Sequence, residues 1–113
     1  MNIYDMEIVR EDTKTIPLKF YTENGDTNIT DWIIFFTCKA KITDPDSAAL
    51  IQKTIIVHTF PLQGETEIKL TSLDTTQNPG NYIYDIQVKY SGEIRTILSG
   101  TLTILSGVTI RVA

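Results

Sequence analysis

Carboxylates are the side chains of this sequence best suited to acid–base chemistry. Hydrolysis by paired carboxylates needs two of them across a cleft, one with a raised pKa. The candidates are Asp12, Asp74 and Asp85, and no spacing in the sequence requires any two of them to meet. Asp74 follows Thr71-Ser72-Leu73, where an aspartate is typical of a cap or a turn. The carboxylates therefore predict no catalytic pair.

The sequence also lacks the groups of residues that would bind a metal ion or activate a nucleophile. Asp44 and Asp46 flank Pro45 like the start of a calcium loop, but the later glycine and glutamate of an EF-hand are missing, which favours a plain turn. The single Cys38 excludes an internal disulfide and a cysteine-based zinc site, and the single His58 excludes a histidine cluster. Cys38 is expected to be a buried, inert thiol, and His58 to be exposed at the end of a strand. No metal, cofactor or enzymatic activity is predicted.

The composition fits one domain spanning residues 1–113. Its 17 threonines and 17 isoleucines are β-branched and favour a pleated sheet. A net charge of −4 argues against nucleic acid, whose binding needs clustered Lys and Arg. The longest apolar run, residues 32–36, is too short to span a bilayer, and the first residues do not resemble a signal peptide. We expect synthesis in a cytoplasm and no membrane partner.

Short segments of alternating polarity, separated by Gly, Pro, Asn and Asp, run through the whole chain. Period-two alternation is the signature of strands with one buried face, and no segment shows helical periodicity over ten residues. The pattern predicts an all-β sandwich, with a barrel as the alternative. The expected strands are residues 6–10, 16–21, 33–41, 50–59, 65–70, 82–90 and 94–105.

Particular residues mark how these strands are expected to begin, end and bend. Pro17 has no N–H to donate, so its strand is expected at a sheet edge or beside a bulge. Ser91-Gly92 is a favoured two-residue hairpin turn. Gly100 predicts a bulge inside the last strand, and Ser72 is expected to cap one helical turn.

The segment 73–82, which leads through Pro79-Gly80 to Tyr82, resembles the corner of immunoglobulin-like sandwiches. There, a tyrosine near the start of a strand ties its hydroxyl to backbone a few residues upstream. Asp85 follows on the opposite face of the same strand, so it must be exposed or paired. A structural ion pair is the favoured interpretation, and a partner-binding role is the alternative. The candidate cross-strand partners of Asp85 are Lys39, Lys41 and Arg95.

Several short motifs follow one another along nearly the whole chain. They are residues 8–13, 35–39, 49–54, 73–75, 79–87, 96–104 and 108–109. In this order they resemble a family of small phage virion domains, best known as the N-terminal domains of upper baseplate proteins of siphophages that infect Gram-positive hosts. The family often has Arg-Gly-Asp-Thr at the first corner, where this chain has Arg10-Glu11-Asp12-Thr13.

The resemblance implies an immunoglobulin-like antiparallel β-sandwich of about seven strands, with short N- and C-terminal arms. It implies a non-enzymatic structural protein of the virion that acts as a baseplate or tail adaptor, with other virion proteins as partners and oligomers only on assembly. Capsid decoration is the alternative. A second alternative is a module that binds host-surface glycans through exposed Trp32, Tyr84 or Tyr90.

Assembly is expected to use strand edges and the two ends of the chain. The candidates are the edge strand that holds Pro17, the arm of residues 1–6, and the last residues of the sequence. Residues 108–113 alternate like a strand and are expected to add to an open sheet edge of a neighbour. The residues of this tail singled out for partner binding are Thr109, Ile110, Arg111 and Val112.

Overall fold

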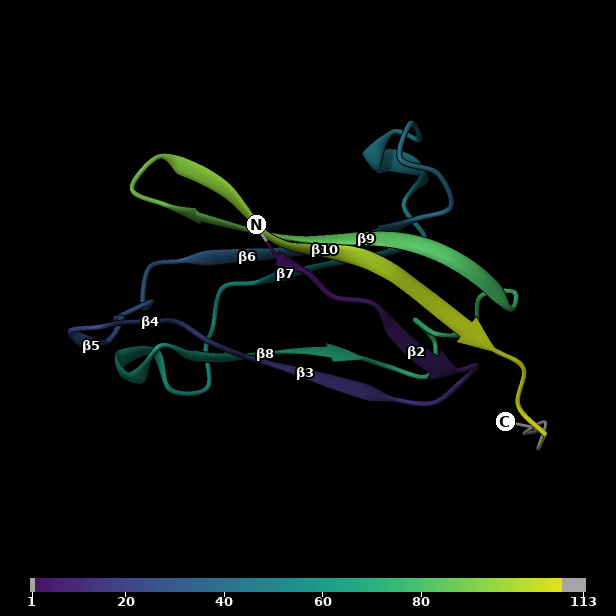
Figure 1. The fold of residues 1–113 in the computed structure, drawn as a ribbon, viewed down its shortest axis with the longest axis horizontal. Helices are drawn as coiled ribbons and strands as arrows, with labels where there is room; N and C mark the ends of the chain where they lie inside the picture. The colour runs from purple at the N-terminus through teal and green to yellow at the C-terminus, as the bar shows by residue number, and fades with distance from the viewer. Residues whose placement is uncertain (1, 109–113) are drawn as a thin grey trace.

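The structure is a computed structural model that describes residues 2–108. This part of the chain contains ten strands and two 3-10 helices of three residues each, so it has no helix that could cross a membrane (Figure 1). The elements are β1 (Asn2–Ile3), β2 (Met6–Val9), β3 (Lys14–Lys19), β4 (Tyr21–Thr22), β5 (Gly25–Asp26), β6 (Ile33–Lys39), η1 (Asp46–Ala48), β7 (Ile51–Ile55), η2 (Pro61–Gln63), β8 (Glu65–Leu70), β9 (Gly80–Tyr90) and β10 (Glu93–Leu105).

The larger sheet has six strands in the order β1-β10-β9-β6-β7, with β2 also pairing with β10. The pairs β10–β9, β9–β6 and β6–β7 are antiparallel. In contrast, β1 and β2 run parallel to β10. The predicted antiparallel pairing therefore holds for the strands from β10 to β7 but not for the N-terminal segment, which lies beside the last strand and runs in the same direction.

A second, two-stranded sheet pairs β3 with β8, and β4 pairs with β5 in a small hairpin. In Figure 1, β3 and β8 form a layer below the larger sheet. One core of buried side chains joins both layers, from Ile16 of β3 and Ile68 of β8 to Phe36 of β6 and Ile86 of β9. Burial of these apolar side chains is the main force that holds two such layers together. The all-β class is confirmed.

The Tyr-rich strand β9 behaves as its alternation predicted. Tyr84, Ile86 and Val88 are buried, whereas Ile83, Asp85 and Gln87 on the opposite face are partly exposed. β6 shows the same alternation over its full length. Because period two puts successive side chains on opposite faces, each strand contributes one face to the core.

The strand predicted over residues 50–59 is wrong beyond Ile55, where β7 ends. The chain then crosses to the other layer, and His58 turns inward with only 7% of its surface exposed. Its Nε2 donates to the carbonyl of Trp32 (2.7 Å), and its Nδ1 lies 2.8 Å from Thr66 Oγ1. The prediction of an exposed His58 is therefore wrong as well, because two hydrogen-bond partners satisfy the buried ring.

The bulge predicted at Gly100 lies elsewhere. The pairing of β9 with β10 shifts between Thr96 and Leu98, while Gly100 stays in register opposite Tyr84. A Cβ at Gly100 would lie 2.1 Å from the carbonyl oxygen of Tyr4. The glycine is therefore needed for the close approach of the N-terminal segment.

One predicted turn is confirmed, and one predicted cap is made by the neighbouring residue. Ser91 and Gly92 have φ values of 49° and 78°, which confirms the predicted hairpin turn. The turn after β8 is capped by Thr71 instead of Ser72. The Thr71 backbone N–H donates to Asp74 Oδ2 (2.8 Å), and the Asp74 N–H donates to Thr71 Oγ1 (3.2 Å).

Candidate functional site

The side chains that could do chemistry are separated and engaged in local structure. Within residues 2–108, no three of the His, Cys, Asp and Glu side chains gather so that they could hold a metal ion. Cys38 is buried, and burial raises the pKa of its thiol to about 12, so it stays protonated near neutral pH. Asp44 accepts a hydrogen bond from the backbone N–H of Lys41 (3.1 Å), as expected of a turn.

Asp74 is part of a small polar network between the layers. Its Oδ2 lies 2.6 Å from Lys53 Nζ on β7 and also accepts hydrogen bonds from Thr71. Burial alone would raise the pKa of this carboxyl, but the hydrogen bonds from Lys53 and Thr71 outweigh burial and lower it. The network fixes the turn after β8 to the edge strand β7.

Asp85 lies on the outer face of the larger sheet, opposite Thr37 on β6 and Ser99 on β10. The ion pair predicted for it does not form among the described residues, because Lys39 Nζ contacts Asp46 Oδ1 (2.7 Å) and the Asp44 carbonyl (2.8 Å). Burial raises the pKa of Asp85, which the charge of Lys39 opposes and that of Asp46 supports. Asp85 is thus a partly buried carboxylate without a direct counter-ion in the described chain.

Tyr82 makes the contact that the sequence predicted for it. It stands at the start of β9, and its hydroxyl donates to the carbonyl of Asn78. The hydrogen bond closes the turn at Pro79-Gly80 and fixes the angle at which the chain joins the larger sheet. Tyr82 is therefore a structural residue.

The N-terminal arm is docked on the larger sheet. Its contacts are a hydrogen bond from the Tyr84 hydroxyl to the Tyr4 carbonyl, one from the Tyr4 N–H to Ser99 (2.8 Å), and one from the Thr101 N–H to Asp5 Oδ1 (2.9 Å). Between the arm and β3 lies a groove of about 480 Å³ that includes Ile3, Tyr4 and Pro17. Two of the predicted assembly elements, the arm and the Pro17 strand, therefore meet at one side of the molecule.

Pro17 lies on an edge strand, as predicted, since β3 pairs only with β8 in the described chain. Successive residues of an antiparallel strand direct their N–H and C=O groups to opposite sides. The Phe20 N–H donates to Gly64 (2.8 Å), so even-numbered residues of β3 point toward β8. The nitrogen of Pro17 accordingly points to the open side. Its missing N–H therefore breaks no hydrogen bond between β3 and β8, but it removes a donor that an added strand would need.

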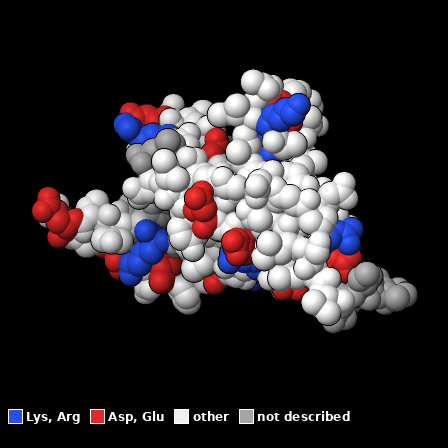
Figure 2. Space-filling view, turned by 45° about the vertical axis from the view of Figure 1, so that its right-hand side comes forward, with Lys and Arg blue, Asp and Glu red and all other residues white. Residues whose placement is uncertain are grey.

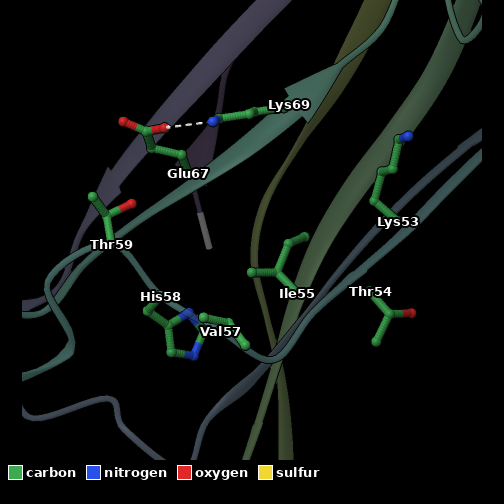
Figure 3. A pocket seen from close by; sticks show the side chains of 8 residues that line it. All are labelled: Lys53, Thr54, Ile55, Val57, His58, Thr59, Glu67 and Lys69. Atoms are coloured by element: carbon green, nitrogen blue, oxygen red, sulfur yellow. Dashed lines mark ion pairs between the residues drawn. The ribbon is translucent and has the colours of Figure 1, made fainter.

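A second groove lies on the other side of the molecule, between β7 and β8 (Figure 3). It has a volume of about 420 Å³, and its lining includes Ile55, Val57, His58, Glu67 and Lys69. Glu67 and Lys69 project from β8 and lie 3.9 Å apart, while Ile55 comes from β7 and Val57 from the crossing segment. The sequence did not single out β8, because the groove exists only once the two layers are stacked. The feature of the sequence that could have indicated an open edge is that the six residues of β8 include no Gly or Pro.

The aromatic residues considered for glycan binding are mostly covered. Tyr84 is buried, with 4% of its surface exposed. Trp32 and Tyr90 are half-buried and stack on each other with ring centroids 4.5 Å apart, and Phe20 packs on the edge of Trp32. Little ring surface of these residues is left to stack on a sugar.

Charged side chains of both signs are mixed on the face drawn in Figure 2, in small groups separated by uncharged surface. Ion pairs of exposed side chains include Lys19 with Asp26 (3.5 Å) and Arg95 with Glu93 (3.4 Å). Thr109, Ile110, Arg111 and Val112, the predicted tail residues, lie outside the described residues.

A scan of the chain against protein-family models finds no match, and a search of curated proteins finds no similar sequence.

Proposed function

We propose that this chain is a non-enzymatic structural protein of a bacteriophage virion, a tail or baseplate adaptor that assembles through strand edges and terminal segments. It is made in the host cytoplasm and incorporated into the particle. The observation that carries the assembly mechanism is the two-stranded sheet β3–β8, whose outer edges pair with no other strand in the described chain, apart from a bridge between Glu65 and Phe60. Unpaired edges offer backbone N–H and C=O groups to a neighbouring chain.

The topology supports an immunoglobulin-like arrangement within this proposal. Immunoglobulin-like sandwiches place strands B and E in one sheet and strands C, F and G in the other. Here β3 pairs with β8 as B would with E, and β6, β9 and β10 are neighbours as C, F and G would be. The hydrogen bond from Tyr82 to Asn78 matches the tyrosine corner of that fold.

The virion assignment is supported by the order of short motifs that resembles the siphophage baseplate family, and by the engagement of the chemical side chains in local structure. Capsid decoration remains the alternative, since it would use the same edges. A glycan-binding module is less well supported, because Tyr84 is buried and Trp32 and Tyr90 cover each other.

The test is a phage that encodes the chain without residues 109–113. We expect the truncated protein to fold but to be missing from purified particles, because the tail supplies the strand that joins neighbours. Circular dichroism of the isolated protein checks folding, and mass spectrometry of particles checks incorporation. A control replaces the five residues by Gly and Ser, which keeps the length and removes the β-prone side chains. Normal incorporation of either variant would contradict the proposed role of the tail.

A further inference from the structure

The outer edge of β8 offers free backbone groups at defined positions. Glu65 uses both its N–H and its C=O to bond Phe60 (3.1 Å each), on the side away from β3. Because the direction alternates along a strand, Glu67 and Lys69 direct their N–H and C=O groups to the same outer side. Beyond Glu65, no hydrogen bond to this edge is formed by residues 2–108.

Two other sheet edges, those of β3 and β7, carry features that disfavour strand addition. β3 carries Pro17, whose nitrogen faces outward. On β7, Lys53 points inward between Ile51 and Ile55 and pairs with Asp74, and an inward-pointing charge is a known device against strand addition. β8 has neither device, so of these three edges it is the one most open to an added strand.

The groove beside this edge suits an extended segment with apolar side chains on one face. Half-buried Ile55 and Val57, which is 83% exposed, offer apolar surface in its lining, and Glu67 and Lys69 project from β8. Glu67 has Lys69 as its ion-pair partner at 3.9 Å, a distance at which the carboxylate can still take a closer cation.

Residues 108–113 have the matching sequence. Val108, Ile110 and Val112 alternate with Thr109 and Arg111, so an extended chain presents three branched apolar side chains on one face and a cation on the other. The segment has six residues, the length of β8. With the apolar face toward Ile55 and Val57, Arg111 lies on the same side as Glu67.

The segment cannot reach this groove within its own chain. β10 ends at Leu105 beside Arg10, on the side of the N-terminal arm. From there, three strand spacings separate β10 from β7, about 14 Å, and the second layer adds about 10 Å. The three residue steps from Leu105 to Val108 span at most about 11 Å. The occupant must therefore come from a second copy.

We propose that residues 108–113 of one copy add as a strand to the open edge of β8 in a second copy, with Arg111 beside Glu67. This inference rests on the proposed function and names the edge that assembly uses. The contact joins two different surfaces, so each copy can accept one tail and donate another, and rings or filaments of copies result.

The test measures self-association of the full chain by sedimentation velocity over a range of concentrations. Lys69→Pro removes an N–H from the open edge, and Thr15→Pro is the matched control. Thr15 stands opposite Lys69 and directs its own N–H to the outer side of β3, so both prolines leave the β3–β8 ladder intact. Glu67→Arg reverses the charge at the edge, and Glu67→Arg with Arg111→Glu restores opposite charges.

We expect concentration-dependent association of the unmodified chain and of Thr15→Pro. Lys69→Pro and Glu67→Arg should each weaken it by at least about tenfold, and the double variant should recover it. An unmodified chain that stays monomeric at every concentration, or equal loss in Thr15→Pro, would overturn the inference. If the protein is monomeric in solution but is found in purified particles, the inference fails and the proposed function stands. If it associates in solution but is absent from particles, the proposed function fails and the contact at β8 stands.

Discussion

At the first corner, Glu11 holds a backbone conformation that usually belongs to glycine. Its φ is 73°, in the left-handed region. This conformation costs an L-residue roughly 1–2 kcal/mol. Glycine avoids this cost, because it has no Cβ to clash in the left-handed region.

Replacing Glu11 by glycine should therefore raise the free energy of unfolding, by up to about 1 kcal/mol. Relief of backbone strain exceeds the extra chain entropy of glycine and the lost contact with Arg10. The matched control is Glu7→Gly, at an exposed position inside β2, which should lower stability by roughly 0.5–1 kcal/mol. Urea denaturation measures both, and an equal loss in the two variants would show that the corner is not strained.

Two aspartates of opposite pKa shift give a second residue-scale prediction. The lowered pKa of Asp74 means that its contribution to stability is present above its ordinary pKa and is lost as the pH falls below it. The raised pKa of Asp85 has the opposite sign, so its contribution is complete at acid pH and is lost as the pH rises through the folded-state pKa. At pH 7 the first carboxylate stabilises the fold and the second destabilises it.

Asp74→Asn should lower the free energy of unfolding at pH 7 by about 1–2 kcal/mol, because it breaks hydrogen bonds to a charged group. Asp85→Asn should raise it at pH 7, and this gain should shrink toward pH 3. Thermal unfolding followed between pH 3 and pH 7 checks both signs. A loss of stability in Asp85→Asn at pH 7 would mean that its carboxylate has a structural partner after all.

Among the elements, the N-terminal arm depends on one glycine. Gly100→Ala would place a Cβ 2.1 Å from the carbonyl oxygen and 2.7 Å from the carbonyl carbon of Tyr4, and these are backbone atoms. We expect the arm to leave the sheet, at a cost of roughly 1–3 kcal/mol. Burial, with Asp5 and Tyr4 beside it, raises the pKa of Tyr84 to about 12, so loss of the arm should lower that pKa toward 10.

Ultraviolet titration of the tyrosines and hydrogen exchange at Thr101 measure this release. Ser99→Ala, one residue away on the same strand, is the control and should change neither. An unchanged Tyr84 titration in Gly100→Ala would show that the arm is held in some other way.

The elements also show what the sequence could predict. The alternation of β9 and the hairpin at Ser91 are local patterns, so the sequence could predict them. The inward turn of His58 depends on Thr66 and Trp32, and the need for Gly100 depends on Tyr4. These partners come from other strands and loops, and no local pattern encodes them. The open edge of β8 was missed for the same reason.

For the whole molecule, the two sides have different character. Both sides carry a groove, but on one side the docked arm and Pro17 stand beside it, whereas on the other side it borders the open edge of β8. If the proposed contact between residues 108–113 and the edge of β8 forms, it joins two different surfaces and is directional, which would suit a subunit that is added in order to a growing particle.

The most direct measurement separates purified phage particles into heads and tails and identifies this polypeptide by mass spectrometry. The proposal predicts that it is found in tails, in a constant ratio to other tail proteins. Its presence in heads alone would contradict the adaptor role and make it a decoration subunit. Its absence from both fractions would contradict the structural role in the virion.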